Sequence, residues 1–395
     1  MAAPIATLLD AFSQIDDPRK PRGVRHPYSS LLALTFLGLL CRQTDRASIQ
    51  RWAEDHWRTF KDALGFTRKK PPHATTISRA LARCSLEQFR DVFARWLTSR
   101  PQTAAAITAA VDGKTSKQGH DAEGDPIPML NVFAHEVNLG LAQFPVTDGK
   151  PTEPQALKSG LNELLDHYPF LRLFTGDALF CQRPWAQVLL EADRDFLFAV
   201  KDNQPELLEA IKTSFHNAAE EPPDAKTVEK KGVEIPTRRL WVREGEEVDY
   251  LRETTHFPGI NLILRVDVEI TQAGAPSRSE TRYLIASLSP DEVSPKRLMT
   301  LVRGPWSVEN GLHFLKDRWW DEDRQWSCRR GLAERLATLR DAALTALRLL
   351  PGVEDDLPIR ARADHLSRKL PKVKLCPTRF FFLIARSSLF SRGRF

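Results

Sequence analysis

The stretch LRLFTGDALFCQRPWAQVLLEADRDFLFAV, residues 171–200, decides the fold class. Its first part, Leu171–Gly176, is a short apolar run of the kind that forms a buried strand, and Phe196–Val200 repeats that pattern. Between them, Pro184–Ala192 has apolar residues at helical spacing. Strands that alternate with helices in this way predict an α/β domain in which neighbouring strands run parallel.

The flanking sequence extends this pattern in both directions. Three strand-like runs come earlier, at Ala104–Val111, Met129–Val137 and Leu139–Val146. Helical stretches are expected at Glu153–Leu165 and Pro205–Phe215. We therefore predict an α/β layered domain whose first part covers residues 99–216.

Residues 1–98 have a different pattern of apolar residues and are predicted to be all-helical. Apolar positions recur at helical spacing in Leu31–Cys41, Ile49–Leu64 and Leu86–Leu97. A proline- and glycine-containing loop near residue 20 carries a cluster of cations, Arg19, Lys20, Arg22 and Arg25. Such a cluster suits DNA phosphates, although a solvated loop explains it equally well.

The remainder divides into three segments. Residues 217–292 contain strand-like runs between charged or Gly/Pro-rich turns, so we predict a β-rich insertion. Helices return in residues 293–352, at Trp306–Trp320 and Gly331–Leu350. Residues 353–395 form a basic tail rich in phenylalanine, which is compatible either with a grip on DNA or with a poorly folded end.

Composition narrows the class of protein without deciding it. The chain has 395 residues, 57 Lys and Arg against 51 Asp and Glu, and a formal net charge of +6, which is compatible with nucleic-acid binding. Five scattered cysteines without CxxC spacing argue against a disulfide framework or a zinc site and fit a cytoplasmic protein. The most apolar early run, Leu31–Cys41, is about half as long as a membrane span, so no membrane partner is expected.

Two aspartates stand where predicted strands end. Asp112 follows the run that finishes at Val111, and Asp177 follows the run that finishes at Gly176. Carboxylates at the ends of adjacent parallel strands emerge at one edge of a sheet, where ligands of open α/β sheets bind. Each aspartate alone is explained as well by a turn, because Asp-Gly is a common turn sequence.

Glu309 is the third candidate carboxylate, on the predicted helix Trp306–Trp320. At roughly 100° per residue, Lys316 lies within about 20° of Glu309 on the helix surface, with His313 between them. Val308, Leu312, Leu315 and Trp319 would then pack on the sheet. A solvated face of paired charges is the commoner outcome for such a trio, but the order strand Asp, strand Asp, helix Glu favours a metal site.

Carboxylate oxygens suit Mg²⁺ or Mn²⁺, which keep some positions for water and phosphate. Two such ions about 3.5–4 Å apart promote in-line displacement at phosphorus. A neighbouring lysine holds a phosphate as a point charge, and Lys316 is the candidate.

These stretches together resemble the DDE transposases of bacterial insertion sequences, in the branch that contains the H-repeat-associated proteins. The resemblance rests on DGKT at 112–115, TGDALFCQ at 175–182, KDNQ at 201–204, RGPWSVENGLH at 303–313 and the acidic triplet at 321–323. The N-terminal helices, with DPR at 17–19 and TTISR at 75–79, resemble the domain that precedes this core. The similarity covers about residues 8–350.

The resemblance implies an RNase H-like mixed sheet flanked by helices, with the β-rich insertion before the last catalytic helix. It implies cleavage and strand transfer at insertion-sequence ends with Mg²⁺ or Mn²⁺, two ions being expected, on Asp112, Asp177 and Glu309. Double-stranded DNA is the expected partner, with self-association on DNA and a cytoplasmic, nucleoid-associated location. The residues expected to contact DNA are Arg303, Trp306, His313, Lys114, Lys201, Arg238, Arg239, Arg19 and Arg22.

Two departures from the family pattern keep an alternative open. Pro305 occupies a position where the family has a charged residue, so Arg303 would substitute for it. The insertion lacks the family's His-Gly-Arg stretch near Gly232, where Arg238 and Arg239 supply the charge. The alternative is a DNA-binding relic or regulator whose catalytic core has decayed; a nuclease without end specificity is a third reading.

Overall fold

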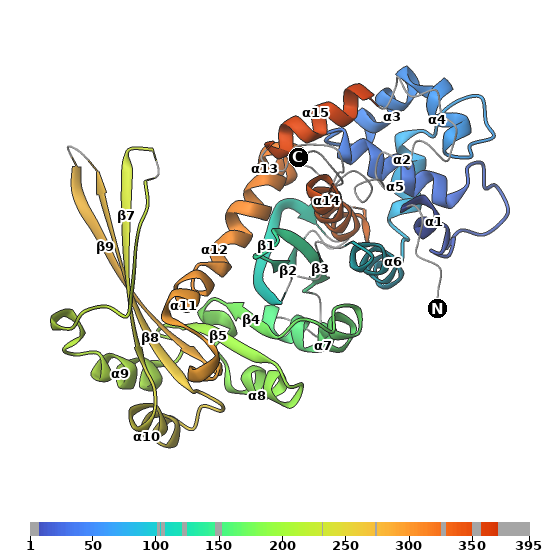
Figure 1. The fold of residues 1–395 in the computed structure, drawn as a ribbon. Helices are drawn as coiled ribbons and strands as arrows, with labels where there is room; N and C mark the ends of the chain where they lie inside the picture. Colours follow the sequence, from blue (N-terminus) through green and yellow to red (C-terminus); the bar gives the residue numbers. More distant parts are fainter. Residues whose placement is uncertain are drawn as a thin grey trace, which may run out of the picture.

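The fold is described from a computed structural model, which covers residues 8–100, 103, 107–120, 125–146, 152–230, 232–272, 275–324, 329–349 and 357–369. Helices occupy the N-terminal part before the first strand (Figure 1). Their bounds are α1 Leu8–Ser13, α2 Tyr28–Leu40, α3 Arg46–Asp55, α4 Trp57–Ala63, α5 Ala74–Leu81 and α6 Leu86–Thr98.

The predicted helix over Ile49–Leu64 is two helices, because α3 ends at Asp55 and the chain turns at His56, whose backbone angles are φ −119° and ψ 18°. The helix α5 has no counterpart among the predicted helices, since only three of its eight residues, Ile77, Ala80 and Leu81, are buried. So short a helix leaves little apolar periodicity to detect.

The described strands form a nine-stranded sheet in the order β3-β2-β1-β4-β5-β9-β8-β7-β6. Only the β1–β4 and β4–β5 pairs are parallel, and all other pairs are antiparallel. The strand bounds are β1 Thr108–His120, β2 Pro126–Ala134, β3 Leu139–Pro145, β4 Leu173–Gly176, β5 Asp195–Val200, β6 Ala225–Val228, β7 Glu234–Arg243, β8 Leu262–Gln272 and β9 Ala275–Ala286.

The strands that follow residue 217 continue the central sheet. β9 pairs antiparallel with β5, with Leu197 opposite Ala286, and β8, β7 and β6 follow outward. The far ends of β7, β8 and β9 project from the body as an arm (Figure 1). This part of the chain also contains a helix that its sequence did not predict, α10 Glu246–Thr255.

Helices cover the sheet and join it to the N-terminal part. Those after the first three strands are α7 Glu153–His167, α8 Arg183–Glu191, α9 Pro205–Ser214, α11 Pro295–Leu301, α12 Gly304–Val308, α13 Phe314–Trp320, α14 Leu332–Arg348 and α15 Ile359–Lys369. α11, α12 and α13 run in line from the arm toward the N-terminal helices (Figure 1). α15 lies in the predicted basic tail, where Ala363 and Leu366 are buried; residues 353–356 and 370–395 of that tail lie outside the described ranges.

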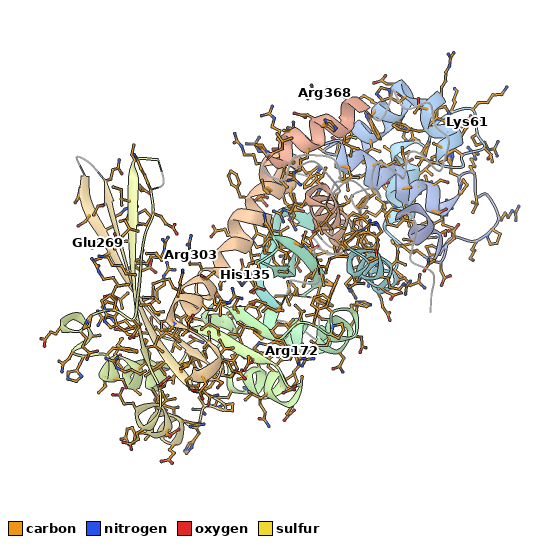
Figure 2. All side chains as sticks on the ribbon, in the orientation of Figure 1. Lys61, His135, Arg172, Glu269, Arg303 and Arg368 are labelled. Carbon is orange, nitrogen blue, oxygen red and sulfur yellow. The ribbon has the colours of Figure 1, made fainter. Side chains whose placement is uncertain are left out.

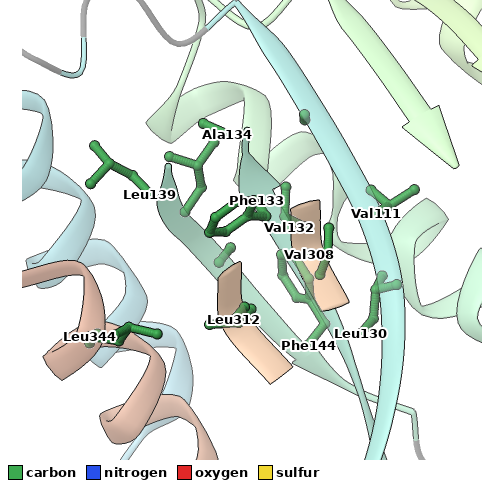
Figure 3. Close-up of a cluster of buried hydrophobic side chains, with 14 of the residues drawn as sticks. Val111, Leu130, Val132, Phe133, Ala134, Leu139, Phe144, Val308, Leu312 and Leu344 are labelled. Carbon is green, nitrogen blue, oxygen red and sulfur yellow. The ribbon is translucent and has the colours of Figure 1, made fainter. Parts of the chain in front are cut away.

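The core between α12–α13 and the sheet follows the predicted apolar face. Val308 and Leu312 are fully buried and face Val132 and Phe133 of β2 (Figure 3). Burial of such side chains contributes about 1.5–3 kcal/mol each, which holds the intervening segment against the sheet. Within the described ranges, none of the helices combines the length and apolar content that a membrane span requires.

Candidate active site

Asp112 and Asp177 lie at the same level of two adjacent parallel strands. Val111 of β1 is the register partner of Gly176, the last residue of β4. Asp112 is the next residue of β1, and Asp177 is the residue that follows β4. β1 continues through Asp112 to His120, paired with β2, and the prediction that the strand ends in a turn at Asp112 is therefore wrong. The reason is the longer partner, β2, which supplies hydrogen bonds beyond the point where β4 stops.

The turn after β4 is held by local hydrogen bonds. Asp177 accepts a hydrogen bond on Oδ1 from the backbone N–H of Leu179, at 2.9 Å. Asn203 donates from Nδ2 to the carbonyl of Ala178 at 2.7 Å, and Gln204 donates from Nε2 to the carbonyl of Cys181 at 3.0 Å. The KDNQ segment after β5 thus braces the loop that carries Asp177.

Glu309 is exposed and begins a π-helical turn, Glu309–His313, between α12 and α13. Together with Asp112 and Asp177 it lines one cavity of about 270 Å³. Burial, reinforced by the negative charges of Glu153, Asp177 and Glu309, raises the pKa of Asp112 to about 7. The surroundings of Asp112 therefore disfavour its negative charge.

A fourth carboxylate, Glu153, approaches the site from the first turn of α7. A Cβ atom added to Gly113 would lie 1.6 Å from Glu153 Oε1, so the carboxylate occupies the space that only glycine leaves open beside Asp112. Burial and the charge of Asp177 raise the pKa of Glu153. The sequence did not identify Glu153, since an acidic residue in the first turn of a helix is common for electrostatic reasons alone.

The chemistry of these donors fits a divalent cation. No three Asp, Glu, His or Cys side chains among the described residues are arranged closely enough to hold a metal ion by themselves. Mg²⁺, however, is usually bound through one or two carboxylates, with water and substrate phosphates completing the shell. A positive ion would offset the mutual repulsion that raises the pKa of Asp112.

Cations also line this cavity. Lys201, Arg238 and Arg303, all predicted to contact DNA, contribute to its lining, as does Arg282, which was not predicted. Glu229 accepts hydrogen bonds from Arg303 at 2.5 and 3.2 Å and from Arg238 at 3.4 Å. Figure 2 shows Arg303 between the arm and α12. The cavity is therefore lined by both carboxylates and cations, including Glu280, which pairs with Arg282 at 2.6 Å.

Asn131 links Asp112 to His313 and Gln143. Its Nδ2 group lies 3.3 Å from the carbonyl oxygen of Asp112 and 3.1 Å from His313 Nε2, and its Oδ1 accepts from Gln143 at 2.7 Å. His313 Nδ1 lies 3.6 Å from Asp112 Oδ2. Burial, with the charges of Lys316 and Lys114, lowers the pKa of His313 to about 3, so its ring is neutral at pH 7.

Lys316 is fully buried and does not line the cavity, in contrast to its predicted position beside Glu309. Its Nζ lies 3.5 Å from Asn131 Oδ1 and 3.9 Å from Glu322 Oε2. The physical reason is the π-helical turn, which has more residues per turn than an α-helix and so shifts the angular position of every later residue.

The other predicted DNA-contacting residues lie elsewhere. Lys114 pairs with Asp317 at 2.7 Å, and Arg239 pairs with Glu269 at 3.1 Å; neither lines the cavity. His313 is buried behind Asp112, and the side chain of Trp306 lies outside the described part of the chain. Arg19 and Arg22 line a separate, larger cavity among the N-terminal helices.

Comparison with known proteins shows which family the chain matches. Residues 108–345, more than half of the chain, match the family model described as Transposase DDE domain, and residues 9–97 match the model described as DDE_Tnp_1-associated. The chain is 26% identical over 348 residues to the H repeat-associated putative transposase YhhI of Escherichia coli, covering 86% of this chain and 90% of YhhI.

Two further relatives show similar coverage. The putative protein YbfL of Escherichia coli is 26% identical over 347 residues, covering 86% of this chain and 90% of YbfL. An uncharacterized protein in the dhlA 3′ region of Xanthobacter autotrophicus is 28% identical over 287 residues, covering 71% of this chain and 94% of that protein. The chain therefore belongs to the Transposase DDE domain family.

Proposed function

We propose that this chain cleaves DNA at the ends of an insertion sequence and joins the ends to target DNA, by in-line phosphoryl transfer that depends on Mg²⁺ or Mn²⁺. The observation that carries the proposal is one cavity lined both by Asp112, Asp177 and Glu309 and by the cations Lys201, Arg238 and Arg303. Such a reaction requires metal-binding carboxylates and phosphate-binding cations in one site.

We also infer that β1 to β5 form an RNase H-like core. The supporting observation is the order β3-β2-β1-β4-β5, with β1, β4 and β5 parallel and β1, β2 and β3 antiparallel. In the proposed domain organisation, residues 1–98 precede the core, and residues 217–292 are inserted before the segment that contains Glu309. Self-association on paired DNA ends is part of the proposal.

In the proposed mechanism, Asp112, Asp177 and Glu309 hold the divalent ions. When bound, such ions activate a water or 3′-hydroxyl and stabilise the leaving oxygen. Lys201, Arg238 and Arg303 hold the flanking phosphates of the DNA strand. Glu229 orients the two arginines through its hydrogen bonds.

The residues behind the carboxylates keep them in position. Asn131 and the neutral ring of His313 fix Asp112, while Asn203 and Gln204 fix the loop of Asp177. Lys316, being buried, is proposed to support Asn131 and Glu322 and not to contact a phosphate directly. Precise placement of this kind is required because phosphoryl transfer is catalysed mainly by positioning and electrostatics.

The test is cleavage of a DNA substrate that carries the element's own ends, with Mg²⁺ or Mn²⁺. We expect Asp112→Asn, Asp177→Asn and Glu309→Gln each to reduce cleavage at least about 100-fold, while DNA binding in EDTA stays within about twofold of wild type. We also expect Mn²⁺ to raise the thermal midpoint of the wild type more than that of these variants. Full activity in the variants would refute the metal site.

The same assay separates the decayed-core alternative. A wild-type chain that binds DNA with salt-dependent affinity, yet shows no metal-dependent cleavage or stabilisation, would favour a relic or regulator. Cleavage of DNA without element ends at the same rate would favour a general nuclease.

Glu153 extends the test to a residue found only from the structure. We expect Glu153→Gln to lower Mn²⁺ affinity, measured by calorimetry, and to reduce cleavage. Asp166→Asn is the matched control, because Asp166 is an exposed carboxylate on the same helix. Equal metal affinity in the Glu153 variant and the control would exclude a role for Glu153 at the metal.

A further inference from the structure

We propose that the N-terminal helices and the segment leading into α14 together form a second DNA-binding site, which holds the phosphate backbone of double-stranded DNA away from the catalytic cavity. This inference rests on the proposed function, in that DNA is taken as the substrate. The site, here named the basic groove, is a cavity of about 930 Å³ bounded by the loop before α2, by α5 and the turn after it, and by residues 329–330.

The loop before α2 contributes one wall. Arg19 holds the loop closed, since its guanidinium donates to both carboxylate oxygens of Asp17 at 2.8 Å and to the carbonyl of His26 at 2.8 Å. Lys20, Arg22 and Arg25 are exposed along the wall that Arg19 braces. The loop thus has a defined conformation and presents its other cations to the groove.

The rest of the lining joins two parts of the chain that are distant in sequence. Arg79 and Arg83 come from α5 and the turn after it, and Arg329 and Arg330 come from the segment before α14. All four are exposed. The groove therefore combines residues from both regions that match a family model: the first pair lies in residues 9–97 and the second in residues 108–345.

Close backbone packing fixes this junction. Gly331 has φ +80°, and a Cβ atom at that position would lie 2.5 Å from the carbonyl oxygen of Ala82. Arg335 donates from Nε to the carbonyl of Cys84 at 2.8 Å. Only glycine allows the approach of residue 331 to the turn after α5, so Arg329 and Arg330 are held beside Arg83 by the fold.

The charge of the groove is unbalanced. No Asp or Glu is among the described residues that line it, and Lys20, Arg22, Arg25, Arg79, Arg83 and Arg330 form no ion pair with any carboxylate of the described ranges. Burial, with a further contribution from the positive charges of Arg68, Arg19 and Arg25, lowers the pKa of nearby His26. A polyanion is the ligand that such a surface fits.

The side chains in the groove favour a duplex backbone over other polyanions. The described residues of its lining include no aromatic ring on which an unpaired base could stack, and no Asn or Gln to read a base edge. Arginine and lysine, with the hydroxyl of Thr76, are the usual contacts to phosphate oxygens. The groove is therefore assigned to sequence-independent contact with double-stranded DNA.

The experiment measures binding of the full chain to a fluorescent DNA duplex that lacks element ends, in EDTA, from about 50 to 300 mM NaCl. For Arg79→Gln/Arg83→Gln/Arg330→Gln we expect at least about tenfold weaker binding at about 100 mM salt. Each phosphate contact that is lost lowers the salt slope by about 0.9, so a total decrease of about two to three is expected. The matched control, Lys158→Gln/Arg172→Gln/Lys212→Gln, removes three exposed cations, from α7, from the residue before β4 and from α9.

Unchanged thermal midpoints establish that both triple variants are folded. Affinity and slope equal to wild type in the groove variant, or an equal loss in the control, would overturn the proposal, as would equally tight binding of an A-form RNA duplex. Because the assay contains no metal, it is independent of catalysis. If the groove variant loses binding but the wild type does not cleave DNA, the groove proposal stands and the proposed activity is refuted. If the wild type cleaves DNA but the groove variant binds as tightly as wild type, the activity stands and the groove proposal is refuted.

Discussion

The carboxylates of Glu153, Asp177 and Glu309 all act on Asp112, and within the described part of the chain its one salt-bridge contact is the ring of His313. The nearest ring, His313, is neutral at pH 7 because burial and two lysines lower its pKa. The pKa of Asp112 is consequently raised to about 7, against an ordinary value of 3.8. A bound cation would favour the ionised form of Asp112, which its present neighbours disfavour.

This raised pKa predicts a pH dependence of stability. Between about pH 4 and pH 7 the unfolded chain has lost the Asp112 proton while the folded chain retains it, so the free energy of unfolding falls as the pH rises. Because 34% of the Asp112 side chain is exposed, solvent screening limits the effect to about 1–2 kcal/mol. Urea unfolding in EDTA at pH 5 and pH 8 measures it.

Asp112→Asn removes this titration. Between pH 5 and pH 8, we expect the free energy of unfolding of the variant to fall by about 1–2 kcal/mol less than that of wild type. Asp166→Asn, at an exposed position, serves as the control and should follow wild type. An identical pH profile for Asp112→Asn and wild type would show that the pKa of Asp112 is ordinary.

At the scale of the element, the π-helical turn Glu309–His313 decides which side chains face the cavity. Glu309 stays exposed at the cavity wall, whereas Lys316 points into the core near Glu322 and Asn131. Glu322 is also 3.4 Å from Arg340, so two buried cations share one buried carboxylate. Such turns frequently occur at functional sites.

The burial of Lys316 leads to a prediction that separates a supporting role from phosphate binding. Lys316→Met leaves Glu322 with Arg340 as its remaining buried cation, so we expect the free energy of unfolding to fall by about 1–3 kcal/mol. DNA affinity in EDTA should be unchanged, because Lys316 does not line the cavity. Chemical unfolding and fluorescence anisotropy measure the two quantities.

The control is Arg318→Met, since Arg318 is an exposed cation on the same helix. This variant should leave stability within about 0.5 kcal/mol of wild type. Weaker DNA binding by Lys316→Met at unchanged stability would instead mean that Lys316 reaches a phosphate.

At the scale of the whole molecule, hydrogen bonds tie the N-terminal helices to the segment after the Glu309 turn. Trp320 donates from Nε1 to the carbonyl of Leu39 at 3.1 Å, and Arg340 donates to the carbonyl of Thr44 at 3.3 Å. α2 is buried at 12 of its 13 positions and packs against α14. The helices of residues 8–98 therefore share their core with residues more than 200 positions later.

This shared core predicts cooperative unfolding. We expect calorimetry of the full chain to show residues 8–98 melting with α14 in one transition, and a fragment of residues 1–100 to lack near-ultraviolet circular dichroism and a sharp thermal transition. The reason is that removal of α14 exposes the apolar surface of α2. A fragment that melts cooperatively near the midpoint of the full chain would contradict this expectation.

Short-range pattern in the sequence was sufficient to predict the α/β class and the apolar face that contains Val308 and Leu312. It was also sufficient to select Asp112, Asp177 and Glu309 as candidate carboxylates. Strand and helix periodicity is set by neighbouring residues, so the elements that carry these side chains can be inferred locally. The parallel neighbours β4 and β5 also followed, because a helix between two short apolar strands allows that connection.

Tertiary structure alone decided the features that depend on register and packing between distant segments. β2 extends β1 past Asp112, Glu153 reaches the space beside Gly113, and a π-helical turn directs Lys316 into the core. The basic groove likewise exists only because Gly331 packs against Ala82. Contacts across such sequence separations leave no local periodicity, which is why the sequence by itself predicted the three carboxylates but not the residues that surround them.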